Sequence, residues 1–325
     1  MTASTRMRAA SLIQVGACGL LGAFESVHMQ NRGLPEAQIG LIMAVESGLM
    51  MITALLWGRI ADLTQRFRLS MTIATVGMVL TFACFAYAEN FAGFMFYGIL
   101  RGIFFTGIMG LMPALALANL DPSKPGSGFG GYRRFGSIGF IWAASVMPLL
   151  FSEISTMALV AMIYLPVSLY FVLGLRDPKA LAAEEVKESM PLNRSALILF
   201  LVAHFLACMS EPAFHGFFNT YARELGASME WVGVLSGMTG VMALLSLGYM
   251  GRLADRIGAG RLLVLGFIAQ VLRMLTTSYI SDPDWLWVAH LFHGFGWAGR
   301  EVGTLLFLTA LMGSSRLGMA TSLMM

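Results

Sequence analysis

The sequence predicts an all-α integral membrane protein, a helical bundle with about ten complete transmembrane helices. Of the 325 residues, 57% are hydrophobic and only 12% are charged, which is about half the charged fraction of an ordinary soluble domain. The mean hydropathy is +0.74. A soluble protein of this size has too small an interior to bury so much apolar surface. The low charge also excludes intrinsic disorder and a nucleic-acid partner.

Each predicted span is a run of apolar residues. A helix needs about 20 residues to cross the hydrocarbon core of a membrane. Because lipid offers no water to unpaired backbone groups, we expect these runs to be helices. They cover about residues 9–29, 36–57, 69–88, 91–117, 136–151, 157–175, 195–221, 230–250, 261–280 and 285–312. Cys18, Cys84 and Cys208 lie far apart inside such runs. We therefore expect these cysteines to be small core residues that form neither a disulfide framework nor a metal site. We expect no cofactor.

The distribution of Lys and Arg predicts the orientation. Most of the 21 basic residues lie before the first span, in the even-numbered loops and after the last span, whereas the odd-numbered loops contain only Arg32 and Arg223. This asymmetry places the N-terminus in the cytoplasm of a multi-pass protein of the plasma (inner) membrane. Residues 176–194 form the longest polar stretch, and we expect a cytoplasmic linker there. It separates a six-helix half, 1–175, from an incomplete half, 195–325, of four helices and the start of a fifth.

The two halves contain an internal repeat. Residues 58–62 read GRIAD and residues 251–255 read GRLAD, an offset of 193. A second match, between RGIFFTG at 101–107 and HGFGWAG at 293–299, has an offset of 192. Collinear matches of this kind predict two parallel copies of one architecture, as many transporters have.

The repeated loop resembles a motif of the major facilitator superfamily, which lies between the second and third helices of each half. The copy at 251–258, GRLADRIG, matches it well, whereas the first copy has Leu63 and Gln65 where Arg and Gly are usual. The resemblance implies a two-half bundle of twelve helices, moved by alternating access. The candidate gating-loop residues are Gly58, Asp62, Arg66, Gly251, Asp255 and Arg256.

A second motif, FGGYRRFGSIGF at 129–140, resembles the start of the fifth helix in the branch that contains phenylpropionate permease-like, nucleoside and oligosaccharide proton symporters. Its candidate residues are Arg133, Gly136 and Ser137. The resemblance implies that Asp255 meets the start of span 5 near Arg133 and Gly136, and that Asp62 meets the eleventh helix. Since 325 minus 193 is 132, we expect the chain to stop as that helix begins, around 316–325, without two closing helices. Asp62→Ala should then impair transport less than Asp255→Ala.

Ionisable side chains inside spans are costly in lipid and mark candidate functional sites. In the superfamily, spans 1, 4, 7 and 10 line the central cavity, and most of these side chains lie on them. Carboxyl groups in a cavity of low dielectric can bind and release protons, so the proton-coupling candidates are Glu211, Glu301 and Glu25. The substrate-cavity candidates are Arg101, His204, His215, His293, Trp297 and Arg300. The alternatives are structural ion pairs for the acids and hydrogen-bonded core residues for the histidines, and Glu46 is expected to be a helix-packing contact.

Together these features predict a secondary active transporter that moves a small organic solute by proton-coupled symport. Its partners would be the solute, protons and the lipid bilayer, and it would act as a monomer and not as an enzyme. The arginines favour an organic acid, whereas Trp297 favours a sugar or a ring-bearing solute. Two alternatives remain: a truncated chain that transports nothing, and a membrane-embedded metal-dependent enzyme with His290, His293 and Glu301 as ligands. HExxH, the usual metalloprotease motif, is absent.

Overall fold

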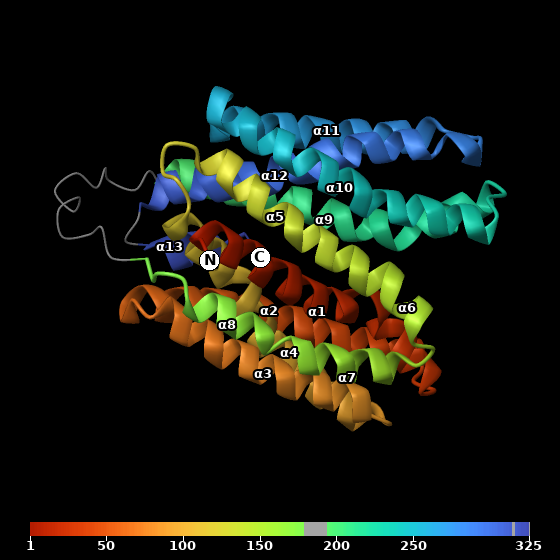
Figure 1. Ribbon diagram of the computed structural model, residues 1–325. Coiled ribbons are helices and arrows are strands. Elements are labelled where there is room, and N and C mark those ends of the chain that lie inside the picture. The colour runs from red at the N-terminus through yellow and green to blue at the C-terminus, as the bar shows by residue number, and fades with distance from the viewer. Residues whose placement is uncertain (179–193, 314–315, 325) are drawn as a thin grey trace. The chain divides into compact units, whose positions relative to one another are not determined.

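A computed structural model describes residues 1–178, 194–313 and 316–324, although several side chains of 194–236 are not described (Figure 1). Every regular element in these residues is helical. The α-helices are α1 (Ala3–Asn31), α2 (Glu36–Thr64), α3 (Phe67–Tyr87), α4 (Phe91–Asn119), α5 (Pro125–Ile141), α6 (Met147–Leu150), α7 (Ile154–Tyr164), α8 (Val167–Leu173), α9 (Arg194–Glu224), α10 (Met229–Ile257), α11 (Ala259–Tyr279), α12 (Trp287–Met312) and α13 (Leu317–Ser322). A π-helix, η1 (Trp142–Val146), and a 3₁₀ turn, η4 (Pro283–Trp285), complete the description.

The all-α prediction is confirmed, and each predicted span corresponds to a helix or to consecutive helices. Among the described residues, six helical segments are long and apolar enough to cross a membrane. Predicted span 5 consists of α5, η1 and α6. Pro148 has no backbone N–H to donate and crowds the preceding turn, which accounts for the local widening to a π-helix. Predicted span 6 is divided into α7 and α8 near Pro166 in the same way.

Two helices begin earlier than their apolar runs. The helix of span 1 starts at Ala3, where the Thr2 hydroxyl accepts a hydrogen bond from the backbone N–H of Thr5 at 3.3 Å. The helix of span 5 starts at Pro125, a residue whose fixed φ suits the first helical position. Hydropathy detects only the apolar part of a helix, so these polar starts were not predicted.

The described helices form two compact units, which differ from the predicted halves in two segments. The first contains α1–α4, the part of α5 from Phe135 onward, η1, α6–α8 and α13. The second contains Lys124–Arg134 at the start of α5, together with α9–α12. The start of α5 thus belongs to the unit of α9–α12, and α13 belongs to the unit of α1–α4, which is the reverse of their places in the predicted halves 1–175 and 195–325. The predicted linker at 176–194 lies almost wholly outside the described residues.

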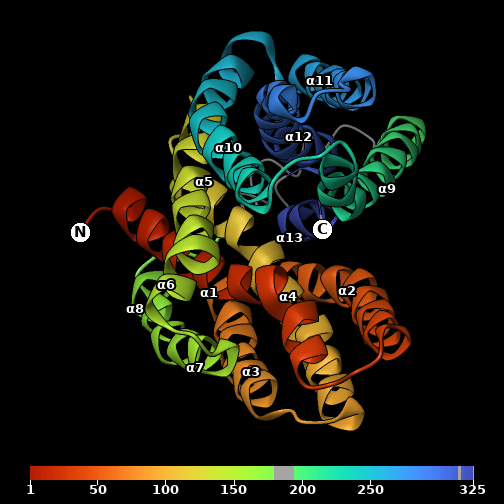
Figure 2. The same ribbon diagram turned by 90° about the vertical axis from the view of Figure 1, so that its right-hand side faces the viewer.

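In the first unit, α4 packs against both α2 and α3 (Figure 2). Two glycines one turn apart, Gly98 and Gly102, permit the approach of α2. A Cβ atom on Gly102 would lie 2.9 Å from the Glu46 carbonyl oxygen, and one on Gly98 would lie 2.9 Å from the Ile42 side chain. The Thr53 hydroxyl donates to the Gly102 carbonyl at 2.6 Å. Small residues of this kind are what allow close helix packing in membranes.

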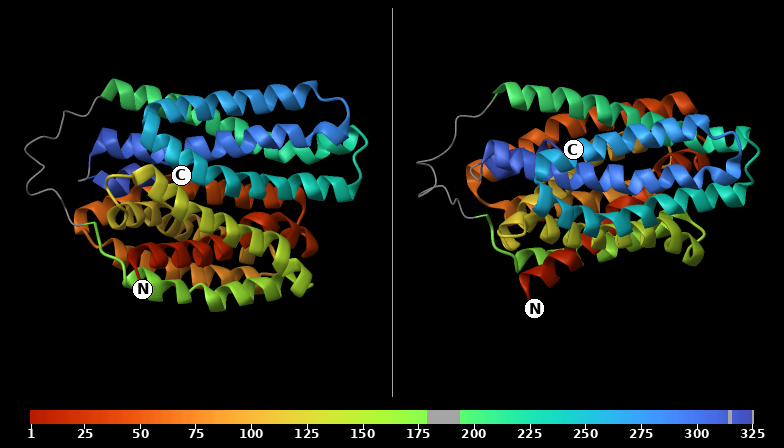
Figure 3. Two further views of the ribbon diagram at one scale, coloured as in Figure 1. Left: turned by 45° about the horizontal axis from the view of Figure 1, so that its top comes forward. Right: turned by 90° about the horizontal axis from the view of Figure 1, so that it is seen from above.

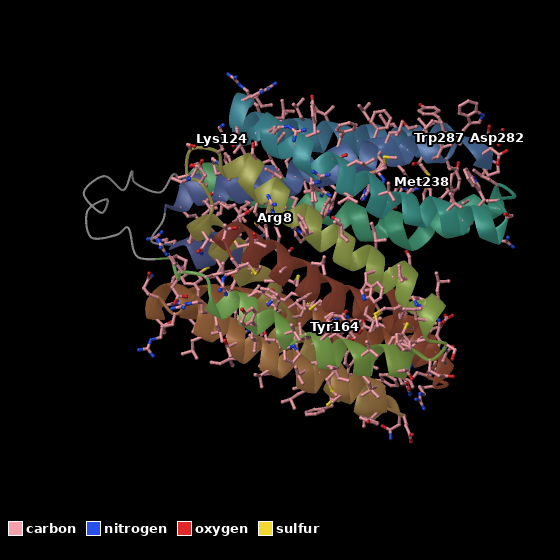
Figure 4. All side chains as sticks on the ribbon, in the orientation of Figure 1. Arg8, Lys124, Tyr164, Met238, Asp282 and Trp287 are labelled. Carbon is pink, nitrogen blue, oxygen red and sulfur yellow. The ribbon has the colours of Figure 1, made fainter. Side chains whose placement is uncertain are left out.

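In the second unit, α12 packs against both α10 and α11 (Figure 3). Gly294 faces the Met242 carbonyl oxygen of α10, and Gly299 faces Gly266 of α11. A hydrophobic cluster of Phe218, Ala222, Ala227, Val232, Leu235 and Leu286 is buried in this unit. Met238 and Trp287 pack against it (Figure 4).

Candidate functional site

The first unit contains a buried cluster of three charged side chains on three helices. Arg101 of α4 donates from Nη1 to Glu25 of α1, and the same Nη1 forms a 2.6 Å ion pair with Oε1 of Glu46 on α2. The exposed fractions are 7% for Arg101 and 5% for each glutamate. One guanidinium nitrogen therefore serves two carboxyl groups that are shielded from water.

The packing of α4 explains why these groups meet. Gly98 and Gly102 bring α2 close to α4 on both sides of Arg101 in the sequence, and the backbone of Glu46 lies against Gly102. One turn before Arg101, Tyr97 is fully buried. Its ring lies 4.8 Å from that of Phe85, centroid to centroid.

The composition of this cluster bears on two predictions. Glu46 was expected to be a helix-packing contact, but its carboxylate joins the charged cluster because the α4 glycines draw α2 inward. Arg101 was expected either to hold a substrate carboxylate or to pair with cavity acids, and its Nη1 pairs with two glutamates. With two carboxylates and one guanidinium, the fully ionised cluster would carry a net charge of −1, which is costly in a low-dielectric interior. One bound proton would make it neutral.

The second unit contains a separate ion pair between α5 and α12. Arg133 Nε donates to Glu301 Oε1 at 2.8 Å, and the side chains are 19% and 22% exposed. The Arg133 guanidinium also lies 5.4 Å from the ring centroid of Trp297, one turn before Glu301, in cation–π geometry. Two members of the predicted site, Glu301 and Trp297, are thus brought together by Arg133, a residue predicted for a different motif.

Asp255 of α10 binds the first turn of α5, as the resemblance implied, but not at Arg133 and Gly136. Its carboxylate accepts hydrogen bonds from the backbone N–H groups of Gly126 and Ser127, each at 2.8 Å, and from the Ser127 hydroxyl. The first N–H groups of a helix have no partner within the helix and attract negative charge. The carboxylate therefore binds two turns closer to the start of α5 than expected.

Asp62 of α2 makes the matching contact with α13. It accepts hydrogen bonds from the backbone N–H groups of Gly318 at 2.7 Å and Met319 at 2.8 Å. Gly318 follows Gly126 by 192 residues, which is the offset of the second match in the internal repeat. Asp62 therefore binds the first turn of α13.

The two loop glycines make room for these contacts. A Cβ atom on Gly58, one turn before Asp62, would lie 2.6 Å from the Gly318 carbonyl oxygen. Gly251, one turn before Asp255, meets the Gly126 carbonyl oxygen in the same way. The remaining loop candidates, Arg66 and Arg256, are exposed.

Other predicted residues occupy varied environments. His204 is half-buried and stacks on Phe200 at 5.3 Å. His293 and Arg300 are buried on α12, and the Arg300 backbone faces Gly266 of α11. Gly136 and Ser137 are buried on α5. The side chains of Glu211 and His215 lie outside the described part of the structure.

The structure also identifies residues that the sequence did not single out, namely Tyr97, Gly126 and Ser127. The first could have been found from its spacing of one turn before Arg101, and the others from the position after Pro125 at a helix start. For the metal-enzyme alternative, no group of three or more His, Cys, Asp or Glu that could hold a metal ion occurs among the described residues. His290 instead contacts the Thr239 hydroxyl at 3.3 Å.

Comparison with known proteins agrees with this architecture. Residues 5–318 match the model of the MFS_1 like family. The chain is 26% identical over 299 residues to a multi-drug resistance efflux pump PmrA homolog of Lactococcus lactis subsp. lactis, covering 85% of this chain and 72% of the relative. Its fold is similar to that of the Escherichia coli fucose:proton symporter FucP, with a TM-score of 0.75, 12% identity and coverage of 99% and 87%. The human organic anion transporter MFSD10 gives a TM-score of 0.72, with 18% identity and coverage of 98% and 89%.

A helical bundle of this kind, with matching loop contacts in a repeated architecture, defines a multi-pass membrane protein of the transporter type. The chain belongs to the MFS_1 like family, within the major facilitator superfamily of membrane transporters.

Proposed function

We propose that this chain is a proton-coupled secondary transporter that moves a small organic solute across the inner membrane by alternating access. It acts as a monomer with its N-terminus in the cytoplasm. The observation that carries the proposal is the buried cluster of Glu25, Glu46 and Arg101, which has one carboxyl group more than it has guanidinium groups. In lipid such an excess is neutralised by binding a proton.

Proton binding gives the cluster two states of different charge. Glu25 thus remains a proton-coupling candidate and is joined by Glu46. Glu301 is a second candidate, because protonation would remove its ion pair with Arg133. Glu211 remains a prediction from the sequence.

The charge of the cluster bears on the solute. An organic acid would add negative charge beside two carboxyl groups, so we favour a neutral or positively charged solute over the organic acid that the arginines first suggested. The PmrA homolog is named as a multi-drug resistance efflux pump and FucP as a fucose:proton symporter, so the two names describe opposite transport directions and only the second includes a proton. The branch resemblance favours symport.

Proteoliposomes that contain the purified chain and an internal pH dye test this proposal. Ethidium, uridine, L-fucose and phenylpropionate serve as probes, added with and without an imposed pH gradient. Proton entry together with a probe indicates symport, and counter-movement indicates antiport. Glu46→Gln should abolish the coupled pH change, whereas Glu36→Gln, at an exposed position on the same helix, should retain it. The proposal is wrong if no probe moves protons and no pH gradient moves a probe.

A further inference from the structure

One end of the first unit gathers basic side chains around the last turn of α8, which packs against α1 (Figure 1). Arg6, near the start of α1, is half-buried and donates from Nη1 to the Tyr170 carbonyl at 3.3 Å. Its guanidinium lies 5.6 Å from the centroid of the Tyr170 ring and against Gly174, where a Cβ atom would overlap it. The glycine thus makes room for the arginine, and these contacts hold Arg6 at the end of α8.

Two further arginines lie at the same end. Arg68, near the start of α3, donates to the Leu173 carbonyl at 3.1 Å and forms an ion pair with Asp177 at 2.9 Å. Arg176 has an exposed side chain, although its backbone is fixed by two hydrogen bonds with Asn119. The three arginines and the one aspartate together carry a net charge of +2.

An exposed apolar stripe runs along α7 and α8 to this end. Its members follow one another at helical spacings of four, three and three residues, and they are Ile163, Val167, Tyr170 and Leu173. Each side chain is at least 52% exposed. Leu165 and Pro166, between the two helices, keep right-handed helical backbone angles, so the stripe continues from one helix to the next.

The length of the stripe matches one leaflet of a membrane. Leu173 follows Ile163 by ten residues, and a helix rises by about 1.5 Å per residue, so the stripe extends over about 15 Å. That is half the thickness of the hydrocarbon core, which is about 30 Å. One acyl chain therefore fits along the stripe while its headgroup reaches the arginines at the end of α8.

We propose that the arginine cluster, formed by Arg6, Arg68 and Arg176, binds the phosphate headgroup of an anionic phospholipid whose acyl chain covers the apolar stripe. Guanidinium groups bind phosphate oxygens in pairs, and anionic lipids attract basic residues at the membrane surface. A zwitterionic lipid is disfavoured, because its ammonium group would be repelled by the net positive charge. The bound lipid joins α1, α3 and the segment after α8, and its binding does not depend on the proposed transport.

Native mass spectrometry of the purified chain, titrated with one lipid at a time and without solute, measures this binding. We expect phosphatidylglycerol to bind more tightly than phosphatidylcholine with the same acyl chains. Arg176→Gln should weaken the binding of phosphatidylglycerol about 5-fold, as expected for the loss of one arginine at the membrane surface. Arg6→Gln should have the same effect. Because the side chain of Arg176 is exposed, its variant decides the outcome if Arg6→Gln, which also loses the bond to Tyr170, is unstable.

Arg8→Gln is the matched control, because it removes the same charge from the same turn of α1. Residues two apart on a helix do not share a face, and the Arg8 guanidinium lies 5.4 Å from the centroid of the Phe135 ring on α5. This variant should bind phosphatidylglycerol as the wild type does. An equal loss in Arg8→Gln and Arg176→Gln would mean that the lipid responds only to total charge, and the site would be wrong.

Two further outcomes would overturn the site. Equal binding of phosphatidylcholine and phosphatidylglycerol would show that the arginine cluster does not recognise the headgroup. Binding of sn-glycerol 3-phosphate as tight as that of the lipid would show that the apolar stripe contributes nothing. Since neither a solute nor a pH gradient is present, none of these results bears on the proposed proton coupling.

Discussion

Two aspartates at matching positions of the internal repeat bind the first turns of two helices, and the contacts differ in their number of hydrogen bonds. Asp62 accepts two backbone hydrogen bonds from α13. Asp255 accepts two from α5 and a third from the Ser127 hydroxyl. The start of α5 is also bound by the Arg133–Glu301 pair and by Arg134, whose Nε donates to the Leu244 carbonyl at 3.1 Å.

The difference shows that a repeat can preserve the geometry of a contact while the number of its hydrogen bonds changes. The aspartate, the glycine one turn before it and the acceptor–donor pattern are common to both contacts. The additional bonds of α5 come from side chains outside the repeated loop. Hydrogen exchange at the amides of Gly126, Ser127, Gly318 and Met319 measures both contacts in one protein.

The largest effect is expected from Asp255→Ala. Loss of a side chain that caps a helix start costs about 1–2 kcal/mol, which corresponds to a 5–30-fold change in an opening equilibrium. The amides of Gly126 and Ser127 should exchange faster by that factor, and coupled transport should fall. Asp255→Asn, which keeps one acceptor oxygen, should have a smaller effect. Unchanged exchange at these amides would contradict the contact.

Asp62→Ala should have the next largest effect, at Gly318 and Met319. In this variant two donors lose their acceptor, whereas three do in Asp255→Ala. We therefore expect exchange at these two amides to rise about 5-fold, the lower end of the range for a helix cap. The expectation that Asp62 matters less than Asp255 thus remains, but its reason is now the number of donors. An effect equal to that of Asp255→Ala would remove the proposed asymmetry.

Glu301→Gln should loosen α5 by less. Its ion pair with Arg133 is about one-fifth exposed, and pairs open to water contribute about 0.2–1 kcal/mol. We expect exchange at Ser127 to rise by about 1.5–5-fold, with a smaller change at high salt because ions screen the pair. Arg133→Gln should raise exchange at Ser127 by the same factor. The double variant should exchange no faster than either single variant. Fully additive effects would mean that the two side chains act independently.

The fold could be predicted from the sequence, because the apolar runs and the repeat offset of 193 residues can both be read from the order of the residues. It also located most of the charged groups, since ionisable residues stand out in apolar runs. It could not assign their partners. Arg133 was expected near Asp255 but binds Glu301, because helix rotation about its axis decides which residue of a motif faces a given neighbour.

Glu46 illustrates a second limit. Its role depends on how closely α2 approaches α4, which is set by Gly98 and Gly102 on the other helix. A Gly-x-x-Arg-Gly pattern marks a close approach, but it does not name the helix that approaches. Partners of buried charges are therefore the part of this site that required three-dimensional information.

The smallest effect is expected from Ser127→Ala, and it tests the asymmetry directly. The substitution removes the hydroxyl that donates to Asp255 and leaves the amides of Gly126 and Ser127 in place. A single hydrogen bond to a charged acceptor that is open to water should contribute at most about 1 kcal/mol, so exchange at Gly126 should rise about 2–5-fold. In this background Asp255→Ala should cost no more than Asp62→Ala does in the wild type. If Asp255→Ala keeps its full effect there, the greater strength of the α5 contact comes from the backbone amides and not from the hydroxyl.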